Sequence, residues 1–172
     1  MKTLQRALLI TGTVTGLIAG SVAASLPASA HSIIELNGAT AYAGKTSTMT
    51  MEIQHGCMPS QPTNKVVVFF KASFGDIVPL KVKGWTTTSG TKANGRKYVI
   101  WQTTTAPQPF PNPLYLPMRI TWPTKAGEYG MPTRQFCVGG GSWFWDTQWH
   151  PATADIPSPP LEPLPSVMVL KP

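Results

Sequence analysis

Hydrophobic and polar residues alternate with a period of two along much of the chain. The stretch TSTMTMEIQ (46–54) sets Met49, Met51 and Ile53 against threonine and glutamate, which is the pattern of a strand with one buried face. KVVVFFK (65–71) is instead a continuous apolar run of β-branched and aromatic residues. Such a run is typical of a strand buried on both faces.

Further short segments of the same character follow at intervals typical of hairpins, separated by glycine- and proline-rich turns. No segment shows helical periodicity with caps. Seven or so short strands predict an all-β protein with an immunoglobulin-like β-sandwich fold. The segments that predict further strands are DIVPLKVKGW (76–85), RKYVIWQT (96–103), LYLPMRITW (114–122) and PSVMVL (165–170).

The first thirty residues differ from the rest and predict an export signal. Lys2 and Arg6 precede an apolar run over 7–23, and Ala28-Ser29-Ala30 has the small-x-small pattern of a cleavage site. We therefore expect a signal peptide over 1–30, a single mature domain over 31–172, and a periplasmic or secreted protein. No later segment approaches the roughly 20 apolar residues that a membrane span needs.

The net charge bears on whether the protein binds nucleic acid, and the number of cysteines bears on whether it forms a disulfide. Cleavage would leave 142 of the 172 residues and remove two lysine or arginine residues, so the net charge would fall from +7 to +5. The lysines are scattered singly, which does not indicate nucleic-acid binding. Cys57 and Cys137 are the only cysteines. In an oxidising compartment they predict one disulfide, since two sulfurs without CxxC spacing do not indicate a thiolate metal site.

The motifs of common enzymes are absent from the sequence. Neither HExxH nor GxSxG nor GxGxxG nor a P-loop occurs, and the three histidines, His31, His55 and His150, are widely spaced. We therefore expect a protein that is not an enzyme. His31 differs from the other two histidines because cleavage would make it the first residue. Its α-amine and its ring Nδ1 could then chelate one Cu(II), a metal that favours nitrogen donors in a plane.

One longer stretch carries a family resemblance. IQHGCMPSQPTNKVVV (53–68) contains His-Gly-Cys separated by four residues from Pro-Thr, and it resembles the signature of the YcnI-like domain family of bacterial exported copper-binding proteins. Later landmarks match in order: the Pro79 to Gly84-Trp85 segment, a strand with Tyr98 and Trp101, and QFCVGGGSW with Cys137 and Trp143. The resemblance runs from His31 to about Trp145.

The resemblance implies one Cu(II) held by the amine and imidazole of His31 together with a carboxylate that follows the second cysteine, beside a tryptophan. The family usually has Trp-x-Glu there, whereas this chain has SWFWDT (142–147). We assign the carboxylate to Asp146 and the neighbouring indoles to Trp143 and Trp145. A regular strand would turn Asp146 away from both indoles, so this assignment requires a bulge near the three glycines. The implied function is copper homeostasis, storage or delivery, with copper chaperones or membrane copper transporters as partners.

For the remaining acidic and histidine residues, the sequence predicts a location rather than a chemical role. We expect Glu35 at the surface, His55 packed near the disulfide with a hydrogen bond to backbone, and His150 exposed. Met49 and Met51 are expected to fill the core. One alternative function is a copper-dependent oxidative enzyme of the polysaccharide-cleaving type, in which His55 or His150 joins His31 in a two-histidine brace. Another alternative is an exported structural or adhesive domain without metal.

Overall fold

The structure, a computed structural model, describes residues 31–156 and 160–172, and the signal peptide predicted over 1–30 lies outside them. The described residues form eleven strands and contain no helix. Accordingly, this part of the chain offers no helix long and apolar enough to cross a membrane. The predicted all-β class is confirmed.

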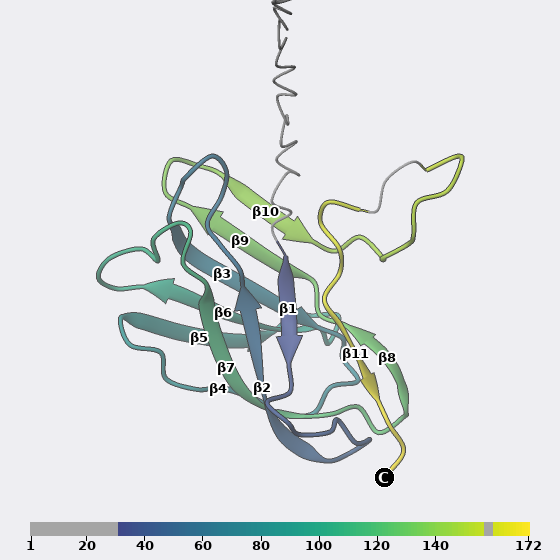
Figure 1. Ribbon diagram of the computed structural model, residues 1–172. Coiled ribbons are helices and arrows are strands. Elements are labelled where there is room, and N and C mark those ends of the chain that lie inside the picture. The colour runs from purple at the N-terminus through teal and green to yellow at the C-terminus, as the bar shows by residue number, and fades with distance from the viewer. Residues whose placement is uncertain (1–30, 157–159) are drawn as a thin grey trace, which may run out of the picture.

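Two antiparallel sheets stack face to face and a small third sheet lies at one side (Figure 1). The first sheet has the order β1-β2-β7-β4, with β1 (Ser32–Glu35), β2 (Thr46–Ile53), β7 (Leu114–Thr121) and β4 (Ile77–Pro79). The second has the order β10-β9-β3-β6-β5, with β10 (Ser142–Trp145), β9 (Thr133–Cys137), β3 (Thr63–Phe70), β6 (Lys97–Thr103) and β5 (Trp85–Thr91). The third pairs β11 (Ser166–Val169) with β8 (Gly127–Gly130).

The core lies between the inner faces of the two large sheets. Met49 and Met51 on β2 are fully buried, as the alternating pattern predicts, and they belong to one cluster with Trp101 and Trp145 from the facing sheet. Methionine suits such a position because its unbranched side chain adapts to the irregular space around large rings.

The prediction that KVVVFFK is buried on both faces is only partly right. On β3, Val66 and Val68 point into the core and are fully buried, but Phe69 on the other face is half-buried. Phe69 is not part of the core cluster that contains Val66 and Val68. The Lys92 ammonium lies 4.9 Å from the centre of the Phe69 ring, so a cationic side chain covers the aromatic residue instead.

The predicted disulfide is present. Cys57, in the loop after β2, is bonded to Cys137 at the end of β9, with 6.0 Å between their Cα atoms. Both residues are buried. The bond thus joins a loop of the first sheet to a strand of the second across 80 residues of chain.

Replacing both cysteines by serine should destabilise the fold by roughly 4 kcal/mol, because the unfolded chain regains the freedom of a long loop. Urea unfolding of the double variant, followed by tryptophan fluorescence, measures this loss. A double variant as stable as the parent would contradict the entropic role assigned to the bond.

Candidate metal centre

His31 is the first described residue and immediately precedes β1. Its carbonyl oxygen accepts a hydrogen bond of 3.2 Å from the amide of Gln54, which continues the pairing of β1 with β2. Ser32 is buried on the core side, so strand alternation turns the His31 side chain toward the outer side of the sheet, where it is partly exposed. The backbone at His31 is therefore fixed while its ring remains accessible.

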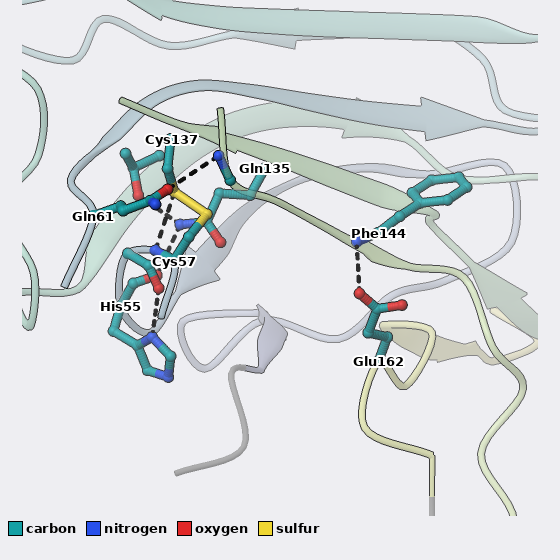
Figure 2. Close-up of a disulfide and its surroundings, with 10 residues drawn as sticks. His55, Cys57, Gln61, Gln135, Cys137, Phe144 and Glu162 are labelled. Carbon is teal, nitrogen blue, oxygen red and sulfur yellow. Dashed lines mark hydrogen bonds between the residues drawn. A yellow bond between two sulfur atoms is a disulfide. The ribbon is translucent and has the colours of Figure 1, made fainter. Parts of the chain in front are cut away.

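His55 lies next to Gln54 and its ring is held by the polypeptide around the disulfide (Figure 2). Its Nδ1 lies 2.7 Å from the Gly56 carbonyl oxygen, so Nδ1 carries the proton and donates it. The ring packs edge-on against Phe110 with 5.2 Å between ring centres, and the His55 carbonyl accepts a hydrogen bond from Gln135. These contacts agree with the expected structural role.

One atom of His55 has no hydrogen bond. With Nδ1 protonated, Nε2 of the neutral ring carries a lone pair, and this atom is buried without a hydrogen-bond partner in the described part of the chain. A ring nitrogen left free while the other donates to a backbone carbonyl is also the arrangement of many metal-binding histidines.

Strand β10 presents its two tryptophans on the inner side and Phe144 on the outer side. Trp145 is fully buried in the core, and Trp143 packs against the core while half-buried. The pairing of β10 with β9 is regular throughout, so the bulge expected near the glycines does not occur in β10. Asp146 follows the strand and is exposed. The structure therefore does not bring the Asp146 carboxylate to the same face as the two indoles.

A second carboxylate, which sequence reasoning missed, lies against β10. Oε1 of Glu162 accepts a hydrogen bond of 3.2 Å from the backbone amide of Phe144, as Figure 2 shows. The main chain of Glu162 is fixed as well, because Thr147 donates its amide to the Glu162 carbonyl and forms a parallel bridge with Pro163. The proline-rich tail thus lies along the free edge of β10.

Trp143, His150 and Glu162 line one cavity of about 420 Å³. Nε1 of Trp143 is buried and has no hydrogen-bond partner among the described residues. His150 is half-buried in the cavity wall, which differs from the expected exposure, because the tail folds back over it. The other described lining residues are Thr147, Ile156, Pro160 and Leu161.

The tail leads from this cavity to β11. After Glu162 the chain enters β11, which is in contact with β1. No three histidine, cysteine, aspartate or glutamate side chains of residues 31–156 and 160–172 are grouped closely enough to hold a metal ion.

Two glutamates lie on the outer face of β1 and β2, on the same side as His31. Glu35 is exposed, as expected, and Glu52 stands opposite Ile33 in the strand register. The pKa of Glu52 is raised above its ordinary value of 4.5, first by burial and then by the negative charge and hydrogen bond of the Glu35 carboxyl. A negative charge close to a carboxyl group disfavours its ionisation, which accounts for the direction of the Glu52 shift.

Comparison with known proteins supports the fold. No family model and no curated protein matches the chain. An uncharacterized protein from Nocardia farcinica, whose crystal structure is described as revealing an immunoglobulin-like fold, is similar, with a TM-score of 0.62 and 18% identity over 81% of this chain and 98% of the other. A cohesin module of a family 33 glycoside hydrolase from Clostridium perfringens has a TM-score of 0.52 and 12% identity over 81% and 94%. The predicted immunoglobulin-like sandwich is thus confirmed.

We expect Glu52→Gln to stabilise the fold near neutral pH. The folded-state pKa of Glu52 is raised, so its contribution to stability is complete below the unfolded value and is lost as pH rises through the folded value. The gain in melting temperature should shrink as pH falls below the ordinary pKa of glutamate. Asp155→Asn, on an exposed side chain, is the control. A lower melting temperature of Glu52→Gln near neutral pH would contradict the assignment.

Proposed function

We propose that the chain is an exported copper-binding protein that holds one Cu(II) through the α-amine and imidazole of His31 and serves copper homeostasis, storage or delivery. The copper ion is its cargo. The resemblance to the YcnI-like domain family supports this proposal, since the His-Gly-Cys, Pro-Thr and Gly-Trp landmarks and both cysteines occur in the family's order.

The observation that carries the proposal is the setting of His31. Its backbone is fixed to Gln54 while its ring remains partly exposed, so a chelate formed there would be anchored to a sheet rather than to a loose terminus. Anchoring reduces the entropy that binding would otherwise cost. Nitrogen donors also suit Cu(II) better than the hard cations.

Two carboxylates, those of Asp146 and Glu162, are candidates for the third ligand of the copper ion, beside the two nitrogens of His31. Asp146 has the sequence position that the resemblance implies, but it is exposed beyond the end of β10. Glu162 shares a cavity with Trp143, and only its Oε1 accepts the amide hydrogen bond of Phe144. Glu162 therefore offers the pairing of carboxylate and indole that the family forms with Trp-x-Glu.

Adding one alanine before His31 should weaken Cu(II) binding by at least tenfold, because it moves the free amine away and leaves the imidazole in place. The Cu(II) affinity of the protein that begins at His31 should also fall as pH drops, since protons compete for both nitrogens. Competition titration against a chelator of known affinity measures both effects. Equal Cu(II) affinity of the protein that begins at His31 and of the variant with the added alanine would refute the amine–imidazole chelate.

Asp146→Asn and Glu162→Gln separate the two carboxylates. Amidation of the carboxylate that completes the site should lower the Cu(II) affinity of the protein about 10- to 100-fold and change the EPR hyperfine pattern. Amidation of the other carboxylate should change neither the affinity nor the EPR pattern. We expect Glu162→Gln to have the larger effect. The glutamine can still accept the Phe144 amide, so a structural role alone would leave affinity unchanged. Full effects from Asp146→Asn alone would restore the assignment made from the sequence.

The two-histidine enzyme is the second candidate, and the unpartnered Nε2 of His55 is the observation that favours it. His55→Ala should then abolish Cu(II) binding, and the copper-loaded protein should consume oxygen in the presence of a reductant. Under the single-histidine proposal, His55→Ala lowers the melting temperature through loss of the Phe110 contact and leaves the EPR spectrum of the bound ion unchanged.

A further inference from the structure

The outer face of the sheet β10-β9-β3-β6-β5 combines cations with aromatic rings. Along this face, the Lys65 ammonium lies 4.1 Å from the centre of the Phe136 ring, and the Arg134 guanidinium lies 5.1 Å from the same centre. Arg134 also lies 5.8 Å from the centre of the Phe144 ring. Each cation is therefore held over apolar surface rather than extended freely into solvent.

The strands of this face carry basic residues and no acidic residue, and the nearest carboxylates, Asp146 and Glu162, lie at its β10 edge. The five strands of the sheet contain no aspartate or glutamate, whereas the neighbouring sheet has Glu35 on β1 and Glu52 on β2. Lys92, in the hairpin after β5, adds a third cation over Phe69. The charge of the mature protein is therefore distributed unevenly, and this face is complementary to an anionic partner.

One end of the face is hollowed. The hollow has a volume of about 300 Å³, and its lining includes Lys65, Phe136 and the β9–β10 turn at Gly140 and Gly141. The remaining lining residues are Asn64, Gln102, Thr103 and Cys137. Its lining is mainly polar, and so it suits a hydrophilic group rather than a hydrophobic one.

One lining residue, Asn64, has a side-chain oxygen that lacks a hydrogen-bond donor among the described residues. The pairing of β3 with β9 shifts between Thr63 and Lys65, so Asn64 is the extra residue of a bulge, a device that redirects a side chain. Its Oδ1 is buried and has no hydrogen-bond partner in the part of the chain that the structure describes. Rotation of the Asn64 side chain toward the hollow would let a ligand hydroxyl donate a hydrogen bond to this oxygen.

We propose that this face binds an acidic polysaccharide and that a hexuronate unit occupies the hollow beside Asn64 and Lys65. A uronate supplies both requirements, because its carboxylate can pair with Lys65 and Arg134 while a ring hydroxyl donates to Asn64. A single-stranded nucleic acid suits the face less well. Its bases stack on open aromatic faces, and here the cations already cover Phe69 and Phe136.

The test uses the protein purified after export and processing of the full-length chain, titrated with an oligogalacturonate by calorimetry at low and at physiological ionic strength. Binding should weaken with salt. Lys65→Gln and Arg134→Gln should each lower affinity about three- to tenfold. Lys65→Arg should retain binding. Arg119→Gln is the matched control, since it removes the same charge from an exposed position on β7 of the other sheet.

Asn64→Ala distinguishes the uronate from other polyanions. It should weaken binding of the oligogalacturonate and leave binding of polyphosphate, which has no ring hydroxyl, unchanged. Melting temperatures close to that of the parent verify folding, and Cu(II) affinity should be unaffected by all five variants. An equal loss with Arg119→Gln, equal binding of the fully methyl-esterified oligomer or of a single-stranded oligonucleotide, or no binding at low ionic strength would overturn the proposal.

Discussion

The Cys57–Cys137 disulfide joins the two sheets and fixes the loop that carries His55 against the end of β9. Cys57 belongs to the loop after β2 and Cys137 to the end of β9, so the bond fastens two elements that the chain alone would leave 80 residues apart. Gln135 on the same strand donates to the His55 carbonyl, and Gln61 accepts the amide hydrogen of Gly141. A disulfide and two glutamine side chains together determine where the His55 loop and the β9–β10 turn meet.

This arrangement explains why some glycines cannot be replaced freely. Gly139 and Gly140 have φ values of +94° and +93°, which side chains with a Cβ rarely adopt. A Cβ at Gly141 would lie only 3.1 Å from Cβ of Cys57 and would also collide with the side-chain amide of Gln61. The three glycines that the sequence places after the second cysteine therefore let the turn approach the disulfide closely, and they leave β10 itself regular.

The sequence predicted the parts of the fold that depend on local pattern. Period-two alternation identified the buried face of β2, and the cysteine count identified the disulfide. It did not predict β8, whose four residues GEYG show no apolar alternation and acquire strand structure by pairing with β11. It also did not predict that cations would cover the outer rings, since Lys92 reaches Phe69 only through the pairing of β5, β6 and β3.

Of the candidate site, the sequence predicted the histidine but not the neighbouring carboxylate. His31 is a candidate because the predicted cleavage would make it the first residue, and its position beside Gln54 follows from the pairing of two strands that are adjacent in sequence. Glu162 could not be anticipated, because its approach to β10 depends on the path of a proline-rich tail with no repeating pattern. Asp146 was placed by analogy of spacing, and the regular register of β10 sends it away from the indoles.

The contact between Glu162 and Phe144 also affects how molecules of this protein meet one another. β10 is the last strand of its sheet, and an uncovered last strand can recruit an identical strand from a second molecule. Here the tail occupies the Phe144 amide and the backbone of Thr147, so part of that row of hydrogen-bonding groups is already in use. The proline-rich tail thus leaves fewer free backbone groups at the β10 edge for pairing with a second molecule.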